Sequence, residues 1–453
     1  MYTDKALTDL GMEASPAVAE ALAERLAQFL APLLSQLDAQ VDKRLVRTFL
    51  TTIQVIIQFR HRSYGLLLSE LGAYILSPDK APAGTKRLSN LLRCQKWSYT
   101  LIDHFLWHQA ETRQAELEAQ GEEVLVVWDT SVLEKPESIA LEGLCAVRSS
   151  KAARLKRIKP GYFNPPGGRP IFVPGMNWLS LLVMGRSGPP TLAAMRWWTT
   201  RGKLASDKRT EEKHLLRRCA DAWGTQVLHI WDRGFAGNPW LTLAFVYTVR
   251  FVMRWNKHYK LVDEQGRERK AWEITRGKRS WEYRYIWDAR RRCWRKTGIV
   301  AVPVTDPVHG QPLWLVVSRP GKGREPWYLL TSEPIHCAED AWRIVFAYAR
   351  RWQVEMAWRY SKSELAMESP RLWFWENRLK LLLMATLAYA FLLSLLDPAL
   401  QDLRQWLLRH WCHRTGKRSR EVSAPLYRLR SALSQLWLAY RPPPLSFIQE
   451  NSG

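Results

Sequence analysis

The apolar run Val124-Leu125-Val126-Val127-Trp128, which ends at Asp129, decides the fold class of this chain. A short, uninterrupted apolar run is typical of a β-strand that is buried on both faces. A second such run covers residues 226–231 and ends at Asp232, and a helical pattern over residues 211–223 precedes it. Strands that alternate with helices predict an α/β core. Sites in such sheets form at the ends of strands, so we expect the two aspartates to converge.

The composition indicates a large, folded and basic protein. The chain has 453 residues, of which 47% are hydrophobic, enough for roughly two to four structural units. Lysine and arginine outnumber aspartate and glutamate by 67 to 43, and the net charge of +24 favours a nucleic acid or an anionic membrane surface as partner. The 24 tryptophans often stand beside arginines, a combination suited to stacking on bases, although any single tryptophan is more often a core residue.

The cysteines and the apolar segments indicate the compartment. The six cysteines are scattered, and none has a CxxC or CxxH spacing. They predict reduced core residues rather than a zinc site or a disulfide framework, and therefore a cytoplasmic protein. The N-terminal segment has no signal-peptide pattern. The most apolar stretch, residues 381–396, is short for a membrane span and predicts a buried helix.

The chain changes character along its length. Residues 1–118 have helical periodicity. Residues 250–297 contain 16 Lys/Arg and 6 Asp/Glu in short alternations of aromatic and polar residues, and they predict a β-rich insertion over residues 250–335. The helices expected after it cover residues 338–362, residues 376–396 and the basic tail from residue 398.

Four residues near the end of this pattern form a chemical constellation. Tyr348, Arg351, Glu355 and Lys362 are spaced by 3, 4 and 7 residues, which places all four on one face of a helix. Such a stripe could be a solvated ion-pair face. Beside DNA it makes better sense, because the glutamate can bind a metal ion while the cations hold phosphates.

The strand-end aspartates point to the same kind of site. Converging carboxylates repel one another unless a cation joins them, and hard oxygen ligands select Mg²⁺ or Mn²⁺. The alternative is that Asp129 and Asp232 are turn or capping residues, which strand-end aspartates often are.

Taken together, these residues resemble a known family. Tyr-x2-Arg-x3-Glu-x6-Lys is the YREK signature of bacterial insertion-sequence transposases that move by cut and paste, and all four positions match at its spacing. Asp129-Thr130 and Asp232-Arg233-Gly234 match two further family features, in the family's order. The resemblance covers about residues 120–395. It implies an α/β fold with a ribonuclease-H-like core, a β-rich insertion and helices at both ends.

The resemblance also implies a division into domains. The units are an N-terminal helical DNA-binding domain (1–118), a ribonuclease-H-like catalytic core (119–249 and 336–397), the β-rich insertion (250–335) and a C-terminal helical dimerisation region (398–453).

The activity implied is DNA transposition by a DDE-type enzyme. Asp129, Asp232 and Glu355 would hold two Mg²⁺ ions, with Mn²⁺ as a substitute, for in-line phosphoryl transfer. The enzyme would cleave the terminal inverted repeats through a hairpin and join the 3′-hydroxyl ends to target DNA. Tyr348, Arg351 and Lys362 correspond to residues that bind phosphates in the relatives. Trp327 corresponds to a residue that stacks on a flipped base; the alternative is a core tryptophan.

Weaker candidates lie elsewhere in the sequence. Arg254 and Lys257 open the insertion and could grip a hairpin, and Arg233 follows Asp232. Lys156 and Arg157 belong to a basic run that is either a DNA-facing or a solvated loop. Other titratable residues are expected to have no catalytic role: we interpret Glu134 and Glu137 as surface carboxylates and His229 as a core residue.

The expected partner is double-stranded DNA, both the terminal repeats and the target. Cut-and-paste needs two ends held together, so a homodimer on DNA is expected, in the cytoplasm and at the nucleoid when bound. Two other readings stay open: a ribonuclease-H-like nuclease or resolvase, and a retired transposase that binds DNA without cutting it. A membrane-surface protein is disfavoured, because no strong basic amphipathic helix is apparent.

Overall fold

The computed structural model describes residues 11–59, 63–138, 140–151, 161, 171–288, 292–412 and 426–442. The buried apolar runs noted above lie at the centre of a mixed sheet, which has twelve strands within these residues. Its central strands follow the order β2-β3-β1-β5-β6, and β4 also pairs with β3. Their bounds are β1 (Val124–Glu134), β2 (Cys145–Arg148), β3 (Phe172–Met184), β4 (Thr191–Trp198), β5 (Val227–Trp231) and β6 (Arg250–Arg254). Strands β1, β3 and β4 are antiparallel, whereas β1, β5 and β6 run parallel.

The strands after residue 250 extend this sheet. Strand β12 pairs with β6, and the order continues β12-β11-β10-β7-β8, with β9 paired to β10. Their bounds are β7 (Lys260–Val262), β8 (Glu268–Lys270), β9 (Glu282–Asp288), β10 (Cys293–Thr305), β11 (Pro312–Arg319) and β12 (Trp327–Thr331), with the short α8 (Ala271–Thr275) after β8. The chain from β6 to β12 is therefore mostly strand, and the backbone hydrogen bonds between β6 and β5 join it to the rest of the sheet.

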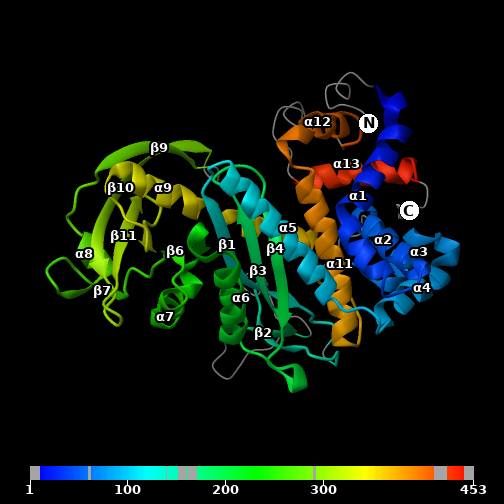
Figure 1. Cartoon of the computed structure of the whole chain (residues 1–453), viewed down its shortest axis with the longest axis horizontal. Coiled ribbons are helices and arrows are strands. Elements are labelled where there is room, and N and C mark those ends of the chain that lie inside the picture. Colours follow the sequence, from blue (N-terminus) through cyan, green and yellow to red (C-terminus); the bar gives the residue numbers. More distant parts are fainter. Residues whose placement is uncertain are drawn as a thin grey trace.

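Helices cover both faces of the sheet, because its apolar strands are buried on both sides. One face packs against α5 (Thr100–Ala119), α6 (Lys208–Trp223) and α7 (Asn238–Val246). The other packs against α9 (Ala338–Ala349), α10 (Trp352–Ser363) and α11 (Trp375–Ser394). The fold is thus mixed α/β with helical layers around one large sheet (Figure 1).

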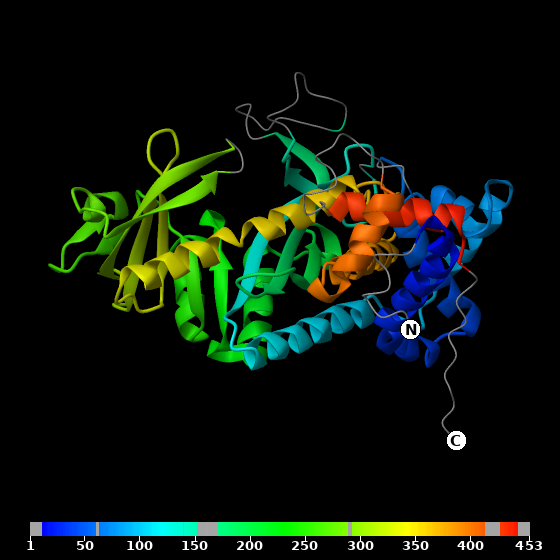
Figure 2. The same ribbon diagram turned by 90° about the horizontal axis from the view of Figure 1, so that it is seen from above.

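The remaining helices form a bundle at the end of the molecule away from the later strands (Figure 2). They are α1 (Ser15–Asp38), α2 (Lys43–Gln58), α3 (Leu68–Ile75), α4 (Ala81–Arg93), α12 (Gln401–His410) and α13 (Leu426–Ala439). Helix α13 is locked into this bundle by the buried Arg430, which donates to the carbonyl oxygens of Ile56, Ile57, Phe59 and Glu364. Its apolar face is therefore used within the chain, so a dimer contact there would have to use its outer face.

One helix in the described part of the chain, α11, is long and apolar enough to cross a membrane by length and composition. Of its apolar window, 89% is buried inside the protein. The prediction of a buried helix over residues 381–396 is confirmed, with the helix beginning earlier, at Trp375, and ending at Ser394.

Candidate active site

Asp129 is a buried carboxylate in the middle of a strand. The expectation that its strand ends at this residue was wrong: β1 continues to Glu134, because residues beyond Asp129 still pair with β3. Pairing with β5, however, stops at Val127, which lies opposite Ile230. Two more residues in this parallel register bring Asp129 opposite Asp232, directly after the end of β5. Sheet pairing thus explains why the two aspartates are neighbours.

Asp232 has a local structural role as well. It precedes a short 3-10 turn, and its carboxylate accepts a hydrogen bond from the backbone amide of Gly234 at 2.7 Å. This is the capping role that the sequence left open. Capping does not exclude a second role, because a carboxylate has about four lone-pair directions. The next residue, Arg233, is exposed.

The helix expected over residues 338–362 is broken in two, which changes how the four-residue constellation is displayed. Helix α9 ends at Ala349, and the amides of Arg350 and Arg351 bond three residues back instead of four. Arg351 is the residue directly before α10, and its side chain reaches Asp129 on β1 of the sheet. The four residues do not form one continuous helical stripe.

Arg351 joins two of the three acids. Its guanidinium donates to Asp129 at 2.8 Å and to Glu355 at 2.6 Å. The contact is largely shielded from water, since the Arg351 side chain is 12% exposed and that of Asp129 is 8% exposed. Charge-assisted bonds of this kind are stronger than neutral ones. Arg351 therefore balances the negative charge of the cluster.

The pKa of Asp129 reports the strain of this cluster. Burial raises it, and so do the neighbouring charges of Asp232 and Glu355, against the attraction of Arg351; the result is a pKa of about 8. Burial disfavours the charged form of Arg351, yet Tyr348, Asp129 and Glu355 raise its pKa above the ordinary value. The three acids are thus electrostatically coupled, and a cation near them is favourable.

A second group of the sequence candidates gathers beside the acids. Trp327 and Tyr348 contact each other edge to face, with ring centroids 5.1 Å apart. Burial raises the pKa of Tyr348, while Arg351 and Arg254 lower it, which places both cations near its phenol. Arg254 is held there by the pairing of β6 with β12, where it lies opposite Leu329. Trp327 is half-buried rather than a fully enclosed core residue.

Lys362 contacts the sheet rather than facing open solvent. Its ammonium group donates to Ser131 at 2.8 Å and lies 5.9 Å from the centre of the Trp178 ring. Burial lowers its pKa. Ser131 is two residues beyond Asp129 and so projects from the same face of β1. Lys362 therefore holds α10 against the strand that carries Asp129.

Two residues at this junction were missed. Trp358 donates from its indole to the hydroxyl of Ser180 at 2.7 Å, in a buried contact between α10 and β3. Ser180 lies opposite Asp129 in the sheet register. The contact fixes α10 relative to β1 through β3. Helical spacing contained a signal for it, since Glu355, Trp358 and Lys362 recur at intervals of three and four residues.

The other sequence candidates have mixed outcomes. Arg254 and Trp327 lie beside Tyr348, whereas Lys257 is exposed in the turn after β6 and Lys156 and Arg157 lie outside the described residues. His229 is a core residue, as expected: it is fully buried and accepts from the Trp128 indole at 2.9 Å. Burial lowers its pKa to about 3, so it stays neutral.

The interpretation of Glu134 as a surface carboxylate was wrong. It is 1% exposed and accepts hydrogen bonds from Ser149 and Ser150. These serines donate hydrogen bonds to the carboxylate from about fifteen residues further along the chain. The local sequence pattern around Glu134 does not show this contact. Glu137, in contrast, is exposed and pairs with Lys135 at 3.1 Å.

The donor set fits divalent cations in its chemistry. Carboxylates from β1, from the end of β5 and from α10 are the hard oxygen ligands that Mg²⁺ and Mn²⁺ prefer. Within the described ranges, no group of three or more His, Cys, Asp or Glu side chains is arranged closely enough to hold a metal ion. The guanidinium of Arg351 contacts two of the three acids instead, so the cluster is balanced by a cation of the chain itself.

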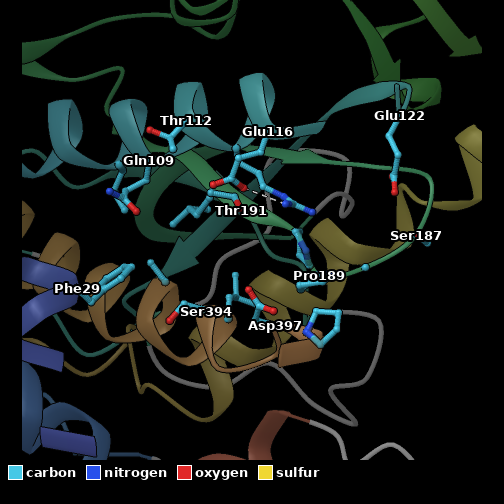
Figure 3. Close-up of a pocket in the computed structure, with 18 of the residues that line it drawn as sticks. Phe29, Gln109, Thr112, Glu116, Glu122, Ser187, Pro189, Thr191, Ser394 and Asp397 are labelled. Carbon is cyan, nitrogen blue, oxygen red and sulfur yellow. Dashed lines mark hydrogen bonds and ion pairs between the residues drawn. The ribbon is translucent and has the colours of Figure 1, made fainter. Parts of the chain in front are cut away.

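A separate cavity of about 600 Å³ lies between α1, α5 and α11, beside residues 187–192. Figure 3 shows Gln109, Thr112 and Glu116 of α5 on one side of it and Ser394 and Asp397 on the other. None of the three acids lines this cavity. It therefore belongs to the junction with the helical bundle and not to the acid cluster.

Comparisons with known proteins add little to this geometry. No protein-family model matches the chain, and a sequence search among curated proteins finds no match either. Among solved structures, the chain matches a cryo-EM structure of the piggyBac transposase synaptic complex with hairpin DNA at 13% identity and a TM-score of 0.38. That match covers 93% of this chain and 85% of the other.

Proposed function

We propose that this chain is a DDE-type DNA transposase of the insertion-sequence class, with Asp129, Asp232 and Glu355 as its catalytic acids. The observation that supports the proposal is that these acids are neighbours, although in this structure they are not close enough together to hold an ion. Sheet register brings the two aspartates together, and Arg351 links Glu355 to the first of them. Strands β2, β3 and β1 pair antiparallel with one another in this order, and β5 and β6 then run parallel to β1. This order supports a ribonuclease-H-like core.

The three acids would hold the two Mg²⁺ ions that such chemistry requires. When bound, the ions would supply Lewis-acid activation for in-line phosphoryl transfer at DNA. Asp129 would be the acid shared by both ions, because the charges of Asp232 and Glu355 both act on it. A raised carboxyl pKa of this kind is common at functional sites, because the arrangement becomes favourable when a ligand arrives.

The residues around the acids are suited to hold DNA. Arg351 and Arg254 supply positive charge next to the phenol of Tyr348, a combination that can bind a phosphate. Trp327 packs on Tyr348 and could present its ring to an unstacked base, as a hairpin step would require. Lys362 positions α10 through Ser131, and its ammonium group would bind a phosphate in place of that hydroxyl group when DNA is bound.

DNA cleavage by the purified protein tests the proposal. The substrate is DNA that carries the inverted repeats flanking this chain's own gene, incubated with Mg²⁺ or Mn²⁺ and resolved on a denaturing gel. We expect nicks at the element boundary with the unmodified chain and none with Asp129→Asn or Glu355→Gln. Asp221→Asn is the matched control, because Asp221 is an exposed aspartate on α6, and it should cut normally.

Other outcomes favour the alternatives. Tight binding of the repeats without cutting in either metal would favour a retired transposase that acts as a DNA-binding protein. Cutting without joining of 3′-hydroxyl ends to a second DNA would favour a nuclease or resolvase. Cutting that survives both acid substitutions would remove these acids from the catalytic site.

A further inference from the structure

The strand β9 and the first half of β10 form a two-stranded ribbon at the border of the sheet (Figure 1). Residues 293–297 of β10 pair with β9, whereas pairing of β10 with β11 begins at Gly298. The ribbon therefore projects past the rest of the sheet. Side chains alternate between its two faces, as in any strand.

The inner face of the ribbon is occupied by contacts within the chain. Arg284 donates to Glu282 and Glu339 and lies over the ring of Trp342 of α9 at 5.3 Å. Ile286 packs against the main core. This face anchors the ribbon to α9, so substitutions on the opposite face need not disturb the fold.

The outer face carries exposed aromatic rings in a row. Tyr283, Tyr285 and Trp287 alternate along β9, and Tyr285 is 68% exposed. Across the ribbon, Trp294 lies opposite Trp287, and their rings meet edge to face at 5.6 Å. Trp294 is itself 65% exposed, which is unusual for the largest apolar side chain. Soluble proteins seldom expose such a patch without a partner.

The charges of this outer face are positive. Lys296 lies opposite Tyr285 and its ammonium group sits 4.7 Å from the centre of the Tyr283 ring. The two acids of β9, Glu282 and Asp288, alternate onto the inner face, where arginines pair with them. In the described ribbon, the aromatic face therefore presents rings and a cation but no carboxylate.

We propose that this aromatic face is a binding platform for single-stranded DNA, with bases stacked on Tyr283, Tyr285, Trp287 and Trp294. Exposed rings combined with positive charge are the two components of single-strand binding surfaces. The site is distinct from Trp327, which packs on Tyr348 beside the acids. The inference rests on the proposed function in one respect, that DNA is the substrate whose strands are opened.

Ring spacing distinguishes a single strand from a duplex. Rings two residues apart on a strand are about 7 Å apart, whereas the bases of a duplex are stacked about 3.4 Å apart and hide their faces. A base can reach one of these rings only when it has left its neighbours. Duplex DNA would contact the ribbon only through its phosphates. Lys296 can bind a phosphate without help from the rings.

Binding of labelled oligonucleotides to the full chain tests the platform. The probe is a fluorescein-labelled oligothymidine of about 20 nucleotides, followed by fluorescence anisotropy. We expect the Tyr285→Ala and Trp287→Ala substitutions each to weaken binding by about tenfold, while Tyr285→Phe, which keeps the ring, binds as the unmodified chain does. Affinity for a duplex of the same length should change less than about twofold, because phosphate contacts remain.

The control is Trp373→Ala, which removes an equally exposed tryptophan far from the ribbon in sequence. It should leave oligothymidine binding unchanged. Equal weakening of single-strand and duplex binding by Tyr285→Ala would overturn the proposal. Unchanged oligothymidine binding together with an altered oligomeric state would also overturn it, and would assign the face to a second copy of the chain. The probe carries no element end and needs no cleavage, so this inference and the proposed function can fail separately.

Discussion

Replacement of Asp129 by asparagine should make the metal-free protein more stable at alkaline pH. The side chain keeps its size, and the one amide oxygen of asparagine can still accept the hydrogen bond from Thr130. The substitution removes the oxygen that accepts from Arg351, together with the negative charge that burial and Asp232 make unfavourable. If the cluster binds cations as proposed, it is expected to reduce stability when no metal ion is present.

The magnitude follows from the two pKa values. An ordinary aspartate has a pKa of 3.8, whereas in the folded chain the pKa of Asp129 is raised to about 8. Between these values the folded state keeps a proton that the unfolded state has lost, so stability falls as pH rises through this window. At about 1.4 kcal/mol per pKa unit the window corresponds to at most about 6 kcal/mol, and we expect about 2–3 kcal/mol after relaxation around the charge.

Thermal unfolding in the presence of a chelator measures this effect. For a chain of this length, about 1 kcal/mol shifts Tm by roughly 1 °C, so Asp129→Asn should gain about 2–3 °C near pH 9 and less near pH 5. The control Asp221→Asn removes an exposed aspartate that pairs with Arg217 at 3.6 Å, and it should shift Tm equally little at both pH values.

A contrary result is easy to recognise. If Asp129→Asn lowers Tm near pH 9, the ion pair with Arg351 outweighs burial and the repulsion from Asp232 and Glu355. The charge of Asp129 would then stabilise the fold, and the argument that the cluster is strained without metal would be refuted.

Three further predictions concern other parts of the molecule. Arg430→Met removes the donor to four backbone carbonyls at the α2–α13 junction and should cost about 3 kcal/mol in urea unfolding; a loss below about 1 kcal/mol would mean that water replaces these bonds. Glu333→Gln weakens the buried clamp that accepts from Arg250 and Arg343 and should cost about 2 kcal/mol in the same measurement; an unchanged midpoint would show that the clamp is not stabilising. Trp327→Ala should slow hairpin formation more than the first nick in a cleavage time course, and equal loss of both steps would indicate a structural tryptophan.

Much of the α/β core was predictable, because its strands are short apolar runs with few alternatives. The runs at residues 124–128 and 226–231 both form strands, and the helix expected over 211–223 is α6. The pairing of these strands could not be read from the sequence. Register alone brings Asp129 opposite Asp232, and it depends on contacts between segments about a hundred residues apart.

The errors also have physical causes. The stripe from Tyr348 to Lys362 was expected on one helix, yet the helix is interrupted at Arg350 and Arg351. Arg350 bonds to backbone carbonyls of residues 187 and 188 and Arg351 to Asp129, and such tertiary contacts can outweigh helix propensity. Glu134 was misread because its partners Ser149 and Ser150 come from another segment. A carboxylate can be buried when other groups donate hydrogen bonds to it, and the local sequence pattern does not show which groups these are.

The continuous sheet sets limits on engineering and on evolutionary exchange. Because β6, the first strand of the segment over residues 250–335, pairs with β5, this segment is joined to the central strands along its backbone and not only through its two chain connections. Excision of this segment as a cassette would leave a hydrophobic strand edge open to aggregation. Chimeras between related chains should therefore exchange the whole sheet, while small fusions should be tolerated at the exposed hairpin turn around Val308 and His309, between β10 and β11.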